Sequence, residues 1–374
     1  MRLLFKINTF NFDFIFRTSP LQPVAFTPVI IMHLSFRGKK ISLDHRALIV
    51  GILNVTPDSF SDGGAFLDPE KACAHGLKLL AEGADILDIG GASSRPGADL
   101  LFTTHKSASS ALSVNTEEEL RRIMPVLQAV RKKTDATISI DTSKASVAEA
   151  ALTAGADIIN DITGLQGDER MGEVVAKARA GLILMHMQGT PETMQKAPSY
   201  LNDDVVTAVI KFLTEARKKA LSYGIDAASI ILDPGIGFGK TFHHNLSLLR
   251  AIPDLTQLGA PVMIGHSRKA FLSCINEPLR DPTRLVSKLA CADAGQEVLG
   301  AQKSEHSSLC DASSTGATQP CTEQVEFRNK FTNRLAPGLT ITSLARQAGA
   351  MLFRVHEPQP HWEAVRMVEQ FLKQ

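Results

Sequence analysis

A single unit recurs along most of the chain: a short apolar run, a polar residue at its end, and a longer stretch with helical periodicity. Near-continuous apolar runs that alternate with helical stretches are typical of parallel strands buried on both faces. Eight such units predict an α/β fold that closes into a (β/α)8 TIM barrel. The predicted strands are Ala47–Leu53, Ala84–Ile89, Thr137–Ile140, Asp157–Ile159, Gly181–Met185, Ser229–Leu232, Pro261–Ile264 and Ala350–Phe353.

The segments on either side of the first predicted strand refine this prediction. A doubly wound open sheet is the alternative fold, but it usually carries a G-x-G-x-x-G turn after its first strand. Here Asn-Val-Thr-Pro follows Leu53 instead, which favours the barrel. Before the first strand, the segment HLSFRGKKISLDHRA indicates a β-hairpin with Gly38 in its turn. In a barrel, such a hairpin could plug the end where the strands begin.

Three segments depart from the repeating unit. Residues 1–31 carry an excess of basic side chains and are either a targeting peptide or an extension that precedes a functional start at Met32. Polar stretches at about residues 100–114 and 295–337 lack apolar periodicity, and we predict that both are flexible insertions. The second falls between the seventh helix and the eighth strand. We therefore expect one barrel domain, residues 32–374.

Composition narrows the classes of partner. The chain has 40 Lys+Arg against 39 Asp+Glu, so it has no basic excess for a nucleic acid or an anionic membrane. No apolar run approaches the roughly 18 residues of a membrane helix. Five cysteines without a C-x-x-C pair argue against a disulfide framework and a zinc site. We expect a cytoplasmic protein with small-molecule partners, or an organellar one if residues 1–31 are a transit peptide.

The polar residues that follow the predicted strands are the candidate site, because the carboxyl ends of barrel strands carry the active sites of barrel enzymes. Short carboxylates and amides suit a flat ring with several N–H donors, and cationic side chains suit an anion. The alternative is that these residues only cap the helices that follow. They are Asn54, Asp88, Asp141, Asn160 with Asp161, His186, Asp233, the cluster His266–Lys269, and Arg354 with His356.

Eight motifs in order along the chain resemble the dihydropteroate synthase family. The resemblance implies a TIM barrel and a transferase of folate biosynthesis. Such an enzyme joins 6-hydroxymethyl-7,8-dihydropterin diphosphate to 4-aminobenzoate with Mg²⁺ and releases diphosphate. The motifs are NVTPDSFSDGG (54–64), GGASSRPG (90–97), ISIDTSK (138–144), INDITG (159–164), LMHMQGTPETMQ (184–195), ILDPGIGFGK (231–240), GHSRKAFL (265–272) and FRVHE (353–357).

The resemblance also implies a role for each matching residue. Asn54 would bind Mg²⁺ and diphosphate, as a hard amide oxygen can. The residues that would hold the pterin are Asp141, Asn160, Asp233 and Lys269. Those that would surround 4-aminobenzoate are Ser94, Arg95, Phe238, Ser267 and Lys269, with Arg268 shaping the pocket. Arg354 and His356 would bind the diphosphate. The residues expected to act in catalysis are Asn54, Lys269, Arg354 and His356.

Three departures from the family pattern stand out. Ser94 occupies a position where the family commonly has Thr, and Glu357 one where it commonly has Asp. The insertion at 295–337 puts the family's helix-mediated homodimer in doubt, so a homodimer is only a possible assembly.

Three other functions compete with the synthase. The segment PGIGFGKT (234–241) resembles a P-loop, but Pro234 replaces its first glycine and has no N–H to offer a phosphate. A methyltransferase acting on methyltetrahydrofolate could share the Asp, Asn, Asp arrangement but has no use for the cations. A silent paralogue would keep the pocket for binding alone. We assign His75, His243 and His244 to helix surfaces or loops and His186 to the barrel interior.

Overall fold

The computed structural model describes residues 33–44, 46–56, 68–92, 115–189, 194, 198–276 and 334–373. The strands are β1 (His33–Phe36), β2 (Lys39–Ser42), β3 (Leu48–Asn54), β4 (Ile86–Gly90), β5 (Thr137–Asp141), β6 (Ile158–Asp161), β7 (Gly181–Met185), β8 (Ile230–Asp233), β9 (Met263–Ile264) and β10 (Leu352–Val355). The α-helices are α2 (Pro69–Ala81), α3 (Thr116–Arg131), α4 (Ala145–Thr153), α5 (Met171–Ala178), α6 (Val205–Ser222), α7 (Phe242–Arg250), α8 (Ile252–Thr256), α11 (Leu335–Gln347) and α12 (Pro358–Leu372). Three short 3₁₀ helices are η2 (Leu201–Asp203), η3 (Ala227–Ser229) and η4 (Ala270–Asn276).

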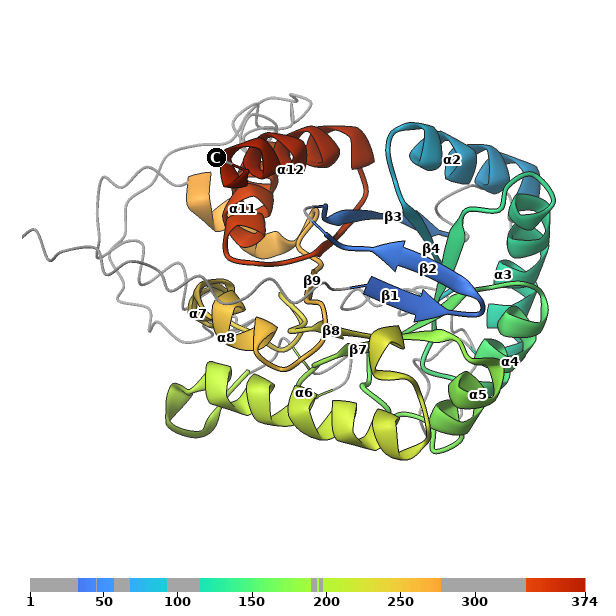
Figure 1. Ribbon diagram of the computed structural model, residues 1–374, viewed down its shortest axis with the longest axis horizontal. Coiled ribbons are helices and arrows are strands. Elements are labelled where there is room, and N and C mark those ends of the chain that lie inside the picture. Colours follow the sequence, from blue (N-terminus) through green and yellow to red (C-terminus); the bar gives the residue numbers. More distant parts are fainter. Residues whose placement is uncertain are drawn as a thin grey trace, which may run out of the picture. The chain divides into compact units, whose positions relative to one another are not determined.

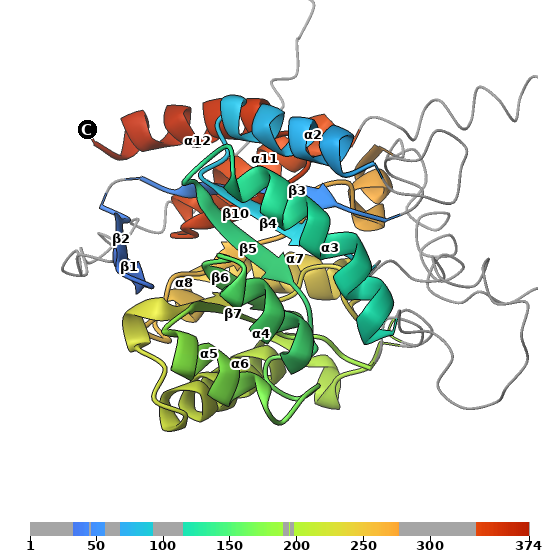
Figure 2. The same cartoon turned by 90° about the vertical axis from the view of Figure 1, so that its right-hand side faces the viewer.

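Strands β3 to β10 form the predicted barrel. They pair in parallel in the order β8-β7-β6-β5-β4-β3-β10-β9. A parallel bridge between Leu232 and Val262 joins the two ends of this order and closes the ring. Helices lie on the outside of the strands (Figure 1 and Figure 2). The TIM-barrel prediction is confirmed.

The strands extend one or two residues beyond most of the predicted carboxyl ends. Asn54, Asp141 and Asp233 are the last residues of their strands rather than the first residues of loops. Asp88, predicted at a strand end, instead lies in the middle of β4. Apolar runs mark only the part of a strand whose side chains pack in the core, whereas backbone pairing continues through residues with polar side chains.

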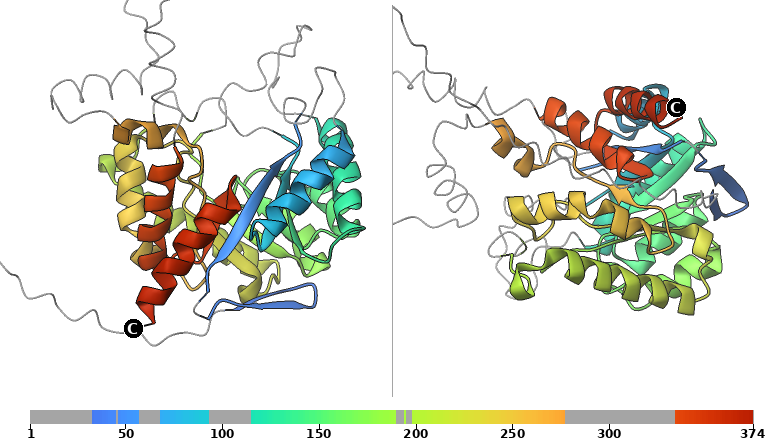
Figure 3. Two further views of the ribbon diagram at one scale, coloured as in Figure 1. Left: turned by 90° about the horizontal axis from the view of Figure 1, so that it is seen from above. Right: turned by 60° about the vertical axis from the view of Figure 1, so that its left-hand side comes forward.

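The β1–β2 hairpin plugs the end of the barrel where the strands begin (Figure 3), as the sequence suggested. Arg37 and Gly38 form its two-residue turn with φ of 47° and 78°, the backbone conformation that tight hairpins prefer. Leu34 and Phe36 pack in one buried cluster with barrel residues such as Val50. The cluster takes apolar side chains from seven barrel strands, among them Val50, Ile86, Ile158, Ile183, Ile231, Met263 and Leu352. Side chains from so many strands meet only in the barrel interior.

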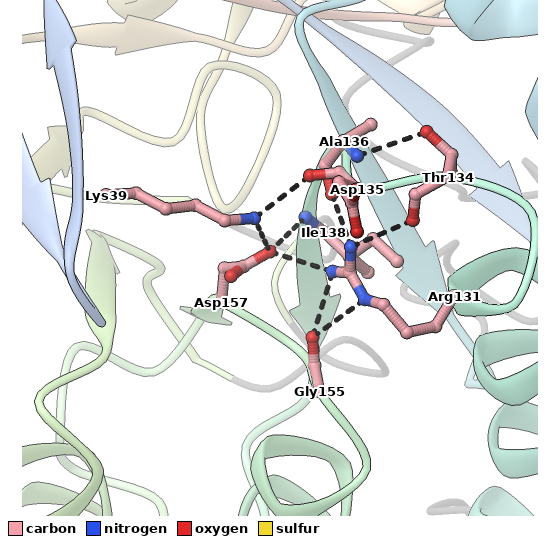
Figure 4. A network of polar contacts seen from close by, with 8 residues as sticks. All are labelled: Lys39, Arg131, Thr134, Asp135, Ala136, Ile138, Gly155 and Asp157. Carbon is pink, nitrogen blue, oxygen red and sulfur yellow. Dashed lines mark hydrogen bonds and ion pairs between the residues drawn. The ribbon is translucent and has the colours of Figure 1, made fainter.

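A polar network ties the hairpin to the barrel (Figure 4). Oδ2 of the buried Asp157 accepts from Lys39 Nζ at 2.9 Å, from the Arg131 guanidinium at 2.9 Å and from the Ile138 N–H at 3.0 Å. Arg131 also donates to the carbonyl oxygens of Gly155, Thr134 and Ala136. The network joins β2, the end of α3 and the start of β5.

We expect Lys39→Met to lower the free energy of unfolding by about 1 kcal/mol, because one charge-assisted hydrogen bond to Asp157 is lost while Arg131 still neutralises the carboxylate. Urea unfolding monitored by circular dichroism measures the change. Lys40→Met is the matched control, since Lys40 is exposed on the same strand. An equal effect of the two variants would show that the network contributes nothing.

The predicted insertions fall largely outside the described residues, as do residues 1–31. The second insertion was predicted to end at about residue 337, and α11 begins two residues earlier, at Leu335. Pro337 is the third residue of that helix, where a missing N–H costs no intrahelical hydrogen bond. Among the helices that the structure describes, none is long and apolar enough to cross a membrane.

Candidate active site

Side chains alternate between the two faces of each strand, and this alternation turns the predicted site residues into the barrel mouth. Val50, Ile158, Ile231 and Leu352 belong to the interior cluster. Alternate side chains of a strand share a face, so Asn54, Asn160, Asp233 and Arg354 face the same interior nearer the carboxyl ends of their strands. The remaining positions are filled by Asp141 from β5, by His356 directly after β10 and by the segment Ser267–Lys269 after β9.

Arg354 is the centre of the polar contacts in this mouth. Its Nε donates to Oδ2 of Asp88 at 2.6 Å, and one of its terminal nitrogens donates to Oδ2 of Asp141 at 2.7 Å. The same Asp88 oxygen accepts from Nδ2 of Asn160 at 3.2 Å. Burial alone would lower the pKa of Arg354, but the two carboxylates hold it above its ordinary value. Arg354 therefore stays cationic and links strands β10, β4, β5 and β6.

Burial sets the protonation of the other charged groups. It raises the pKa of Asp141 to about 7, against the opposing effect of Arg354 and with a further contribution from Asp88. It also raises the pKa of Asp233, which Lys269 opposes. The same desolvation lowers the pKa of Lys269 to about 7. Asp141 and Lys269 therefore change charge near neutral pH, where a ligand that pairs with them can shift the balance.

The loop after β8 shapes the wall on which Lys269 lies. Gly237 has φ of 81°, and a Cβ there would lie 2.8 Å from Lys269 Cδ, so the glycine lets the lysine pack on the loop backbone. Lys269 Nζ donates to the carbonyl oxygen of Ile236. It also lies 4.3 Å from the ring centroid of Phe238, a cation–π distance. The loop thus brings Phe238 and Lys269 together, as the resemblance implies for the arylamine pocket.

Ser267 and His356 form a second polar contact in the mouth. Ser267 Oγ accepts from the backbone N–H of His356 at 3.2 Å and lies 3.1 Å from its Nδ1. This contact joins the segment after β9 to the residue after β10. Arg268 forms an ion pair with Glu357 at 2.6 Å, the residue that departs from the family pattern.

The lysine of the P-loop-like segment has a structural role. Lys240 is buried, and its Nζ lies 3.0 Å from Nδ1 of His186 and donates to the carbonyl oxygen of Phe238 at 2.9 Å. An inward-facing lysine does not bind a nucleotide phosphate, so the P-loop interpretation fails. His186 is a hydrogen-bonded interior histidine, as predicted. The surface assignment of His244 is wrong, because its side chain is buried and forms the capping box of α7 with Thr241.

The structure therefore gathers most of the predicted site, and it brings Asp88, a strand-end candidate without an assigned role, into contact with that site. Ser94 and Arg95 lie outside the described residues. Asp88 was absent from the predicted binding set although its signal is visible: a carboxylate within the apolar run ILDIG, at an interior position of the strand. Within the described part of the chain, no cluster of three His, Cys, Asp or Glu side chains forms a metal site. The fold and the site define a TIM-barrel enzyme whose mouth presents hydrogen-bond acceptors and cationic side chains together.

Comparison with known proteins agrees with this class. Residues 50–300 match the family of pterin binding enzymes. Dihydropteroate synthase of Escherichia coli K12 is 40% identical over 263 residues, which cover 70% of this chain and 86% of that protein. The Synechocystis enzyme of the same name is 44% identical over 230 residues, 62% of this chain and 74% of that protein.

Solved structures give the same result. Xanthomonas albilineans dihydropteroate synthase with 4-aminobenzoic acid has a TM-score of 0.66 and 36% identity, covering 91% of this chain and 98% of that one. The Yersinia pestis enzyme with a sulfonamide drug has a TM-score of 0.68 and 32% identity, covering 91% and 99%. The chain belongs to the pterin-binding enzymes, within the dihydropteroate synthase family.

Proposed function

We propose that this chain condenses 6-hydroxymethyl-7,8-dihydropterin diphosphate with 4-aminobenzoate to form 7,8-dihydropteroate, with the residue roles given below. The C–O bond between the pterin methylene and the diphosphate breaks, a C–N bond to the arylamine forms, and the amine loses one proton. The observation that carries this proposal is the convergence of acceptors (Asp141, Asn160, Asp233) and cations (Lys269, Arg354) at one end of the barrel.

Asp141, Asn160 and Asp233 hold the pterin ring by accepting hydrogen bonds from its amino and N–H groups. Lys269 donates to the ring carbonyl. Each hydrogen bond to a charged group contributes about 1.5 to 3 kcal/mol. Because these groups are withdrawn from water, a ring that lacks the matching donors leaves a carboxylate unpaired and is rejected.

Arg354 and His356 stabilise the leaving diphosphate. Arg354 brings a permanent charge from β10, and the His356 imidazole adds a hydrogen-bond donor. Asn54 at the end of β3 fits Mg²⁺, because a single amide oxygen suffices for an ion that takes most of its ligands from substrate phosphates and water. When bound, Mg²⁺ neutralises charge on the diphosphate. The main contributions to catalysis are then charge neutralisation and positioning, with no strong base required.

The arylamine lies in the pocket formed by Phe238 and Ser267, beside the Lys269 side chain. Arg268, held by Glu357, shapes the rim of this pocket. Ser94 and Arg95, which lie outside the described residues, complete it in this proposal.

Diphosphate release by the purified full chain tests the proposal. Dihydropterin diphosphate and Mg²⁺ are supplied with and without 4-aminobenzoate, and the product is identified by mass spectrometry. Release that depends on the amine, with dihydropteroate formed, supports the synthase. Pterin binding without turnover would instead identify the silent paralogue.

We expect binding of an unphosphorylated pterin to be strongest near pH 7. Asp141 must be ionised to accept, and its raised pKa of about 7 weakens binding as the pH falls. Lys269 donates most strongly as an ammonium group, so its lowered pKa of about 7 weakens binding as the pH rises. Calorimetric titration from pH 5.5 to 8.5 measures the loss of affinity on the acid and on the alkaline side of the optimum. Lys269→Met should abolish only the loss on the alkaline side. A flat profile for the wild-type chain would contradict these assignments.

A further inference from the structure

Asp88 is a buried carboxylate with an uneven set of partners. The side chain has no exposed surface, and it lies in the barrel interior one step below the mouth. Its Oδ2 accepts from both Arg354 and Asn160, at 2.6 Å and 3.2 Å. Its Oδ1 has no hydrogen-bond partner among the described residues. Burying a carboxylate costs folding free energy unless hydrogen bonds and a counter-charge compensate for the lost hydration.

The contact with Asn160 decides how that side chain is oriented. A carboxylate only accepts, so the amide must turn its NH2 group to Asp88 and its carbonyl oxygen away from it. Asn160 then presents an acceptor to a ligand in the mouth. An acceptor is the group that a ring edge carrying an amino or N–H donor requires.

The contact with Arg354 restricts the guanidinium in the same way. With Nε held by Asp88, the planar group has one orientation in which a terminal nitrogen also reaches Asp141. Asn160, Arg354 and Asp141 line this part of the mouth. The orientations of the first two depend directly on Asp88, and the contact of Arg354 with Asp141 depends on it in turn. Asp88 itself does not line the mouth.

We propose that Asp88 is a positioning residue that makes Asn160 an obligate acceptor and so determines the selection of a donor-bearing pterin edge. The inference rests on the proposed function, since it explains how the same pocket selects its ring. Asp88 acts through Asn160 and Arg354 and has no contact with the reacting atoms.

Asp88→Asn separates this role from simple support of the fold. The new amide can donate to the carbonyl oxygen of Asn160, which allows Asn160 to turn its NH2 group into the mouth. Calorimetry then compares a pterin with its 2-oxo analogue, in which an acceptor replaces the amino donor. We expect the variant to bind the pterin at least tenfold more weakly and to lose at least tenfold of the wild-type preference for it. The KM for 4-aminobenzoate should change less than twofold.

Ser139→Ala is the matched control. Ser139 is the partner of Asp88 in the β4–β5 register, is equally buried, and has an Oγ without a partner among the described residues. The control should keep the wild-type preference. Equal losses of affinity for both ligands in Asp88→Asn, or an unchanged preference, would overturn the positioning role. Because binding needs no turnover, this result is separate from a failure of the synthase assay with the wild-type chain.

Discussion

Asp141→Asn is expected to weaken pterin binding by about 10²- to 10⁴-fold, because a charged acceptor is lost and an amide donor can face the N–H groups of the ring. The side chain is at the carboxyl end of β5 and accepts from Arg354 at 2.7 Å. Calorimetric titration with a pterin at pH 7 measures the loss. Wild-type affinity in the variant would remove Asp141 from the pocket.

The same variant should be more stable than the wild type at alkaline pH. Burial raises the pKa of Asp141 from 3.8 to about 7, so the wild-type chain is destabilised as the pH rises through that range and the buried carboxyl ionises. The cost reaches up to about 4 kcal/mol. An asparagine does not ionise, so the difference in the free energy of unfolding should grow from pH 5 to pH 8.

Urea unfolding of both chains at pH 5, 6, 7 and 8 checks this prediction. Loss of binding together with a gain of stability shows that the carboxylate is retained for its ligand at the expense of the fold. A variant that is less stable than the wild type at every pH would show instead that the ion pair with Arg354 outweighs the burial.

Arg354→Met is expected to lower the free energy of unfolding by about 3 to 5 kcal/mol, because two buried carboxylates lose their counter-charge. It should also lower kcat/KM by at least about 10²-fold, through loss of charge stabilisation at the diphosphate. Asp88 is the deeper of the two carboxylates. Adding Asp88→Asn to Arg354→Met should therefore recover more than about 1 kcal/mol of stability but none of the activity.

The matched control is Arg121→Met, which removes an ion pair to Glu118 on the exposed face of α3. Its side chain is 51% exposed, and the change should stay within about 1 kcal/mol. Chemical unfolding of the four chains at one pH, with turnover measured on the folded protein, distinguishes these expectations. If Arg354→Met is as stable as the control variant, the carboxylates are not held by Arg354.

The sequence was sufficient for the barrel because the relevant signal is local. Apolar runs alternate with helical stretches, and each run marks a strand buried on both faces. The hairpin with Gly38 followed from the same kind of signal. The exact strand ends did not, since Asn54, Asp141 and Asp233 continue the backbone pairing with polar side chains.

The motifs also identified most of the residues that the structure brings together at the mouth, because strand ends of a barrel meet at one end whatever their separation along the chain. The contacts within the mouth were beyond the sequence. Arg354 and Asp88 are 266 residues apart, and His244 became a buried cap only because α7 packs as it does.

What the sequence by itself determined is therefore the repeating unit, the fold and the chemical types of the side chains at the strand ends. Only the tertiary structure decided which of these groups form hydrogen bonds and ion pairs with one another. Closure of the barrel brings β10 beside β3 and Arg354 within reach of β4 and β5. Burial in that closed ring then moves the pKa of Asp141 and of Lys269 toward 7, an effect of desolvation that no local pattern encodes.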